Sequence, residues 1–111
     1  MSAITTHVLD TALGRPAAGV PVRLERIGDT TPQSLAESVT DADGRIRELG
    51  PESLEPGSYR LVFDVAHYAA ATGQDYFLSA VDISFTPTEG RAHYHVPLLL
   101  SPFACSAYRG S

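Results

Sequence analysis

The chain has 111 residues, a formal net charge of −5 and one cysteine, and its 8 basic residues are all arginines. This length predicts a single domain spanning residues 1–111. The absence of lysine excludes Schiff-base and P-loop chemistry, and the single cysteine excludes an internal disulfide and a multi-cysteine zinc site. Scattered arginines on an acidic chain make nucleic acid and anionic membranes poor partners.

Apolar and polar residues alternate along most of the chain, as in strands with one buried face. Turn residues separate these runs at 14–16, 41–44, 55–57 and 87–90. We therefore expect an all-β, two-sheet β-sandwich of about eight strands. In chain order, the expected strands span residues 4–10, 20–28, 35–41, 45–49, 59–65, 77–86, 91–100 and 104–108.

One short helix is expected between the fifth and sixth strands, from Ala66 to Thr72, because Gly73 supplies a natural C-terminal stop. Pro97 falls inside the strand at 91–100, and proline cannot donate to a strand ladder. This position predicts an edge strand or a bulge. A long apolar edge at 96–100 would invite pairing with another chain, which favours an oligomer.

The sequence predicts a cytoplasmic location. No apolar run is long enough for a transmembrane helix, and residues 1–10 lack the apolar stretch of a signal peptide. The single cysteine is in keeping with a reducing compartment.

Four histidines could carry chemistry. His93 and His95 are two residues apart, so on a strand both side chains project from one face. Such a pair can present two metal ligands, but it also occurs as solvated surface residues. On pattern alone, His7 is a polar residue of an exposed strand face, and His67 is a surface residue or a local turn partner.

The remaining reactive residue types give weaker signals. Arg45 follows a turn at the start of a short strand, where a surface arginine is the ordinary interpretation. Cys105 has no sequence neighbour that would lower its pKa, so we expect it to pack. Ser101 and Ser106 lack the surroundings of a nucleophile elbow.

Three segments, however, carry a specific resemblance. They are Thr6–Asp10 with its continuation Gly14–Ala17, then Thr40–Arg45, then His93–Phe103 closed by Tyr108-Arg109-Gly110-Ser111. Together they resemble the 5-hydroxyisourate hydrolase family, transthyretin-like enzymes of urate breakdown. The match spans nearly the whole chain. Cys105 departs from it, because the family usually has an aromatic residue there.

The same resemblance separates this chain from the hormone carrier transthyretin, which shares the fold. His7 stands where transthyretins carry Lys, Arg45 where they carry Glu, and His95 where they carry Thr. Transthyretins also continue past the point where this chain has Tyr-Arg-Gly-Ser. All four choices follow the enzyme pattern.

The resemblance implies hydrolysis of 5-hydroxyisourate to 2-oxo-4-hydroxy-4-carboxy-5-ureidoimidazoline in purine catabolism, with neither metal nor cofactor. It implies a homotetramer, a dimer of dimers, with active sites at the dimer–dimer interface. The implied catalytic residues are His7, Arg45, His95 and Ser111, and the implied substrate-binding residues are Arg45, Tyr108, Arg109 and Ser111. Which histidine is the base stays open, and His93 is expected to play a supporting role.

Two alternatives remain at this point. One is a non-enzymatic, transthyretin-like carrier of a small aromatic ligand. The other is a metal-binding β-sandwich that uses His93 and His95, with His7 as a third candidate ligand.

Overall fold

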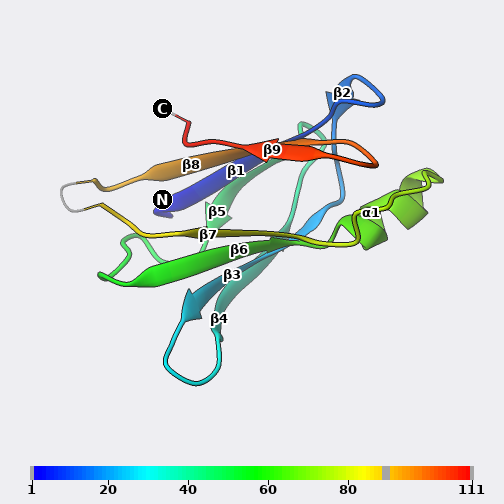
Figure 1. The fold of residues 1–111 in the computed structure, drawn as a ribbon. Coiled ribbons are helices and arrows are strands. Elements are labelled where there is room, and N and C mark those ends of the chain that lie inside the picture. The colour runs from blue at the N-terminus through cyan, green and yellow to red at the C-terminus, as the bar shows by residue number, and fades with distance from the viewer. Residues whose placement is uncertain (1, 89–90, 111) are drawn as a thin grey trace.

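Two β-sheets stack face to face in the computed structural model, which describes residues 2–88 and 91–110 (Figure 1). The five-stranded sheet comprises β1 (Ile4–Asp10), β2 (Arg15–Pro16), β5 (Arg45–Leu49), β8 (Tyr94–Leu100) and β9 (Cys105–Ala107). Its order is β2-β1-β8-β9, and β5 also pairs with β1. The four-stranded sheet comprises β3 (Pro21–Ile27), β4 (Gln33–Val39), β6 (Ser58–Phe63) and β7 (Val81–Phe85), in the order β4-β3-β6-β7. The predicted all-β sandwich is confirmed.

The core lies between the sheets because each strand turns one parity of side chains inward. Along β1 the inward residues are buried, whereas Thr5, His7 and Leu9 on the outer face are half-buried. Burying a Val, Leu, Ile or Phe side chain stabilises a fold by about 1.5–3 kcal/mol. The largest fully buried aliphatic and Phe side chains include Ile4, Leu24, Leu49, Leu61, Phe63, Leu98 and Leu100.

The single expected helix is present as α1 (Val65–Thr72) at one end of the sandwich (Figure 1). Asp64 caps its N-terminus by accepting the N–H of His67 at 3.1 Å. Gly73 ends it in the left-handed conformation with φ of 66°. Within the described residues, no helix is long and apolar enough to cross a membrane.

The buried carboxylate of Asp10 ties the end of β1 to this helix. Its Oδ2 accepts the hydroxyl of Tyr68 at 2.6 Å and the side-chain amide of Gln74 at 3.0 Å. Its Oδ1 accepts the N–H groups of Ala12 at 3.0 Å and Leu13 at 2.9 Å. Burial raises the pKa of Asp10, but these hydrogen bonds together hold the pKa below its ordinary value. Asp10 is therefore an ionised anchor for the helix.

Three local predictions were wrong. The predicted turn at 14–16 contains β2, whose two residues are too few to show an alternating pattern. The strand expected at 77–86 begins only at Val81, because the N–H of Phe77 donates to the carbonyl of Pro102 instead of to a ladder, and Phe77 is 80% exposed. Cys105, expected to pack, is exposed on β9 at the edge of its sheet.

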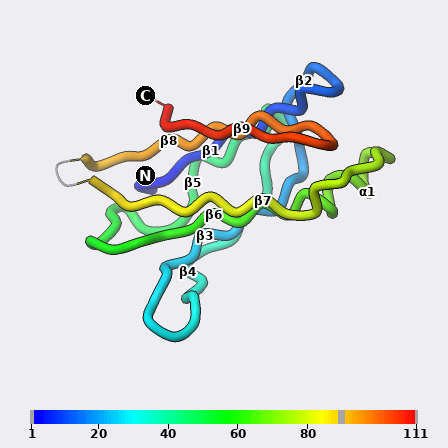
Figure 2. Tube along the Cα trace, in the orientation of Figure 1, coloured from blue at the N-terminus to red at the C-terminus, as the bar shows by residue number. Residues whose placement is uncertain are grey.

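Pro97 does not mark an edge strand, since β8 lies between β1 and β9. The segment after β9 keeps one register along β8: the N–H of Tyr108 donates to Pro97 O at 3.4 Å, and His95 bridges to Gly110. Proline returns no hydrogen bond, so the ladder is only interrupted at this point. Figure 2 shows this segment running back along β8 towards its start. The apolar run at 96–100 is thus covered within the chain.

Candidate active site

Three neighbouring strands bring the predicted catalytic side chains together on the outer face of the five-stranded sheet. In the β1–β5 ladder His7 is the partner of Arg45, and in the parallel β1–β8 ladder Thr5 is the partner of His95. All four residues have the outward parity of their strands and are half-buried. Because β1 pairs with both β5 and β8, it places His7 and Arg45 on the same sheet face as His95 from near the other end of the sequence.

A shallow pocket of about 210 Å³ opens on this face. Of the residues that the structure describes, its lining includes two arginines, two imidazoles and no carboxylate: Thr5, Thr6, Arg45, Ile46, Arg47, His93 and His95. Arg47 is paired with Asp41 at 3.0 Å. Among residues 2–88 and 91–110 no ion pair is found for Arg45, and a guanidinium in this pocket can bind a polar or anionic ligand.

The turn before β5 positions Arg45. Asp41 Oδ1 accepts the N–H of Asp43 at 2.9 Å and that of Arg45 at 3.0 Å, and these bonds lower the pKa of Asp41. Gly44 has φ of 74°, and a Cβ there would collide with the carbonyl oxygen of Val8. The turn therefore requires glycine.

The same turn holds the ring of His7. Nε2 of His7 lies 2.9 Å from the carbonyl oxygen of Asp43. A carbonyl oxygen can only accept, so Nε2 must carry a proton. In neutral His7 the lone pair therefore sits on Nδ1.

His95 has the surroundings of a proton acceptor. Burial lowers its pKa, and the positive charge of Arg45 and the neighbouring His7 and His93 lower the pKa further. The neutral imidazole is thus favoured near pH 7. Nδ1 of His95 lies 2.8 Å from Oγ1 of Thr5. A hydrogen bond with the Thr5 backbone acts in the opposite direction and raises the pKa of His95, but burial and the neighbouring charges outweigh it.

The C-terminal segment closes over the ring of His95. The N–H of Gly110 donates to His95 O at 2.7 Å. A Cβ at Gly110 would lie 2.6 Å from Cδ2 of His95 and 3.3 Å from Cγ of Pro97. Only a residue without a side chain fits so near the imidazole. Ser111, predicted to act in catalysis, lies outside the described residues.

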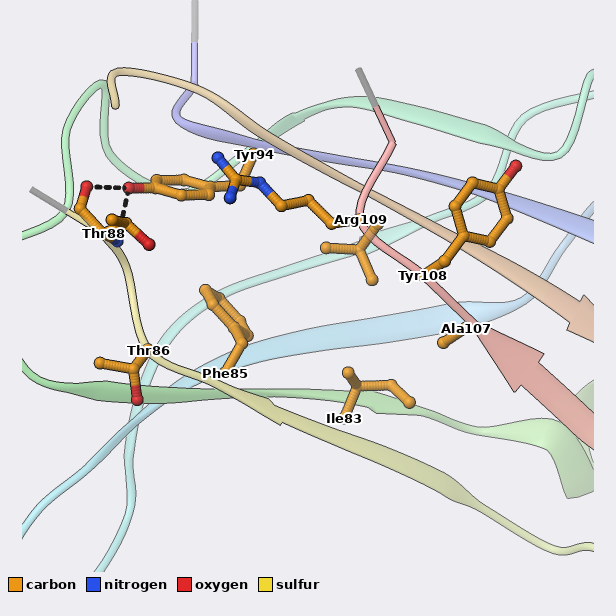
Figure 3. A pocket seen from close by; sticks show the side chains of 9 residues that line it. Ile83, Phe85, Thr86, Thr88, Tyr94, Ala107, Tyr108 and Arg109 are labelled. Atoms are coloured by element: carbon orange, nitrogen blue, oxygen red, sulfur yellow. Dashed lines mark hydrogen bonds between the residues drawn. The ribbon is translucent and has the colours of Figure 1, made fainter. Parts of the chain in front are cut away.

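Arg109 and Tyr108 lie elsewhere in the single chain. The guanidinium of Arg109 stacks over the ring of Tyr94 at 5.5 Å, and Tyr94 bonds to Thr88 (Figure 3). Arg109 and Tyr108 line a second pocket of about 250 Å³ between the sheets, together with Tyr94 and with Ile83 and Phe85 of β7. The structure does not bring Arg109 to the pocket of His95.

Sequence reasoning assigned no role to Thr5. Its Oγ1 lies between two imidazoles, 2.8 Å from His95 Nδ1 and 3.1 Å from His93 Nε2. The available signal was its parity, since Thr5 shares a strand face with His7. In the described ranges, no group of three His, Cys, Asp or Glu residues could hold a metal ion, so the geometry lends the metal alternative no support.

Comparison with known proteins extends these observations. A family model described as the HIUase/Transthyretin family matches residues 4–110. The 5-hydroxyisourate hydrolase of Caulobacter vibrioides is 48% identical over 115 residues, which cover 100% of both chains.

Two solved structures share the fold. The 5-hydroxyisourate hydrolase of Klebsiella pneumoniae superposes with a TM-score of 0.87 at 36% identity, covering 99% of this chain and 100% of that one. Sea bream transthyretin in complex with thyroxine gives 0.90 at 32% identity, covering 97% and 94%. Fold similarity alone therefore does not separate an enzyme from a carrier.

Proposed function

Because the chain belongs to the HIUase/Transthyretin family, we propose that it is a hydrolase that opens the ring of 5-hydroxyisourate at a C–N amide bond. The product is 2-oxo-4-hydroxy-4-carboxy-5-ureidoimidazoline, and the reaction is a step of urate breakdown. The observation that carries the proposal is the meeting of His7, Arg45 and His95 on one outer sheet face. Each of these residues is the one that the hydrolase pattern requires.

In this proposal His95 is the general base. Its lowered pKa keeps it neutral, and Nε2 takes a proton from water as the water oxygen bonds to the substrate carbonyl carbon. The developing oxyanion is stabilised by the guanidinium of Arg45 through charge-assisted hydrogen bonds. When the C–N bond breaks, the leaving nitrogen takes a proton from Nε2. The scheme uses no metal and no cofactor.

His7 has a different task in this scheme. Its Nε2 is bound to the Asp43 carbonyl, so only Nδ1 remains to contact the substrate or the attacking water. We assign His7 to orienting these groups beside Arg45, its partner across the ladder. The two histidines thus divide proton transfer from orientation.

The C-terminal motif completes the proposed site. The contact of Gly110 with His95 supports a position of the terminal residues at the pocket. We propose that Ser111 orients water or substrate rather than acting as a nucleophile. Tyr108 and Arg109 are proposed to bind substrate, which for Arg109 requires a neighbouring protomer or a movement away from Tyr94.

We further propose a homotetramer, a dimer of dimers, with the active sites at the dimer–dimer interface. The support is the shallowness of the pocket, which opens from an outer sheet face in one protomer. A partner covering this face would exclude water and strengthen the interactions of Arg45. Native mass spectrometry would test the assembly. A single domain and a cytoplasmic location remain part of the proposal.

The decisive experiment is a direct assay. Urate oxidase generates 5-hydroxyisourate from urate, and its ultraviolet signal is followed with and without the purified protein. The proposal expects decay well above the spontaneous rate. Decay at the spontaneous rate would overturn it.

The similarity to thyroxine-bound sea bream transthyretin supports a second candidate, a carrier of a small aromatic ligand. The presence of His7, Arg45 and His95 speaks against it. A carrier would bind thyroxine stoichiometrically and leave the decay of 5-hydroxyisourate unchanged.

A further inference from the structure

The hydroxyl of Thr5 connects the base of the proposed reaction to a histidine that the reaction scheme leaves unused. Oγ1 lies 2.8 Å from Nδ1 of His95 and 3.1 Å from Nε2 of His93. Both rings line the pocket, and in the single protomer His95 is half-buried whereas His93 is exposed. A continuous path of two hydrogen bonds therefore links the half-buried ring to the more exposed one.

Hydrogen-bond chemistry limits how this path can be protonated. A hydroxyl has one hydrogen to donate and two lone pairs with which to accept. Thr5 can donate to only one of the two rings, so at least one ring must donate its own N–H to Thr5. If His95 donates from Nδ1, its Nε2 keeps the lone pair that a base needs. Thr5 is then free to donate to Nε2 of His93.

We propose that Thr5 is a positioning residue that holds His95 with its proton on Nδ1 and relays protons between His95 and the exposed His93. This inference rests on the proposed function and deepens it. Thr5 lines the pocket, but the role proposed for it is towards His95 rather than towards substrate or water. It acts through the tautomer and the proton balance of His95.

The relay balances at each step. When Nε2 of His95 takes a proton from water, Nδ1 passes its proton to Oγ1 of Thr5, and Thr5 passes its own to Nε2 of His93. His95 stays neutral and His93 becomes the cation. When Nε2 gives its proton to the leaving nitrogen, the proton held by His93 returns through Thr5 to Nδ1.

The charges around His95 explain why such a relay is useful. Arg45 from β5 and His7 from β1 face the ring, His93 precedes it on the chain, and Arg47 lines the same pocket. A proton retained on His95 would add a second positive charge beside Arg45 in a partly desolvated site. His93 is the more exposed of the two rings, so a positive charge there carries a smaller desolvation cost than on His95.

The activity test compares Thr5→Val, which keeps the shape but loses the hydroxyl, with Thr5→Ser, which keeps the hydroxyl. We expect Thr5→Val to lower kcat about 10–100-fold at little change in KM, and Thr5→Ser to restore most of the rate. The matched control is Thr11→Val, whose hydroxyl donates to Leu100 O at the far end of β1. Equal rates for Thr5→Val and Thr5→Ser would overturn the proposal.

A second variant removes the other end of the path without changing His95. Because His93 is exposed, the His93→Gln variant should fold normally. It should lower kcat about as much as Thr5→Val does. Because both changes break one relay, the double variant should cost no more than either single variant. Multiplied losses would show that the two residues act independently and would contradict the relay.

Nitrogen-15 NMR of the imidazoles gives a readout that needs no activity. We expect neutral His95 to carry its proton on Nδ1 in the wild type, and to lose this preference in Thr5→Val but not in Thr5→Ser. A proton on Nε2 of wild-type His95 would overturn the inference. A protein without hydrolase activity but with the expected tautomer would instead count against the proposed function.

Discussion

His7 and Arg45 face each other across the β1–β5 ladder, and one turn holds both of them. The Asp41 carboxylate binds the backbone N–H of Arg45, while the Asp43 carbonyl binds the ring of His7. The ring of His7 and the backbone of Arg45 are thereby fixed side by side on neighbouring strands.

Arg45→Lys should lower kcat/KM about 100–1000-fold, because lysine keeps the charge but loses the planar fork that can bind an oxyanion with two donors. The measurement is the initial rate of 5-hydroxyisourate loss. Arg26→Lys is the matched control, since Arg26 lies in β3 and pairs with exposed Glu55. A rate for Arg45→Lys close to that of the control would refute the role of the guanidinium.

His95→Asn should remove most activity while the circular dichroism spectrum and the assembly stay intact, because asparagine fits the site but cannot act as a base. His7→Asn should retain more of the rate if His7 orients rather than transfers protons. If the activity of His95→Asn were near that of the wild type, a group other than His95 would be the general base.

The pH dependence should reflect the lowered pKa of His95. A base is active when neutral, so a lowered pKa extends activity to more acidic solution than an ordinary histidine, with a pKa of about 6.5, would allow. The acidic limb of the kcat/KM profile should therefore fall below about 6.5. Arg45→Gln should move that limb upward, because it removes one of the charges that disfavour the imidazolium. An unshifted limb in this variant would contradict the electrostatic cause.

Gly110→Ala should impair catalysis more than folding, because the added Cβ would collide with the ring of His95. We expect a marked loss of kcat with a melting temperature close to that of the wild type. An extension fused after Ser111 should also lower activity, since the terminal residues are proposed to lie at the pocket. Full activity in both proteins would place the terminal motif elsewhere.

Tyr68→Phe should destabilise the fold by about 1.5–3 kcal/mol, the range for a hydrogen bond to a charged group. Tyr59→Phe removes a hydrogen bond to an uncharged acceptor, the backbone carbonyl of Glu55, and should lower the free energy of unfolding by about 0.5–1.5 kcal/mol. Denaturant unfolding at one protein concentration compares the two. Equal losses would show that the Asp10 carboxylate adds nothing.

The same contact sets a pH window. The folded pKa of Asp10 is lowered, so its stabilising contribution is present above the unfolded value of about 3.9 and is lost as pH falls through the folded value. The difference between wild type and Tyr68→Phe should accordingly shrink in acid. A difference that is constant down to the most acidic pH would contradict the linkage.

The fold was predictable wherever one strand face is buried, because alternation then reports burial directly. Prediction from alternation failed at Arg15–Pro16, because a strand of two residues is too short to show a period. It also failed at Phe77, which has the same parity as the apolar residues of β7 but donates its N–H to a loop carbonyl. The prediction that Pro97 marks an edge strand was wrong, because β8 is paired on both sides. Pro97 still accepts the N–H of Tyr108, and only the hydrogen bond that its own nitrogen would donate is missing.

For the site, local pattern gave only surface interpretations of His7 and Arg45, and the family resemblance supplied their roles. Register then showed how they meet. Neither the local pattern nor the family resemblance pointed to Thr5, because threonine is common in strands. The role proposed for Thr5 comes from its hydrogen bonds to the rings of His93 and His95, which lie near the other end of the sequence. Such a contact exists only after the parallel ladder has formed.

That parallel ladder has a consequence for folding. Thr5 and His95 are 90 residues apart, so β1 must wait for nearly the whole chain before β8 can pair with it. Non-local pairing of this kind slows folding, because the chain must lose the entropy of closing a long loop before the stabilising contacts between the two strands form. During synthesis, therefore, the first strand emerges early and the pocket assembles last. Refolding experiments should show return of activity lagging behind formation of the local β3–β4 hairpin.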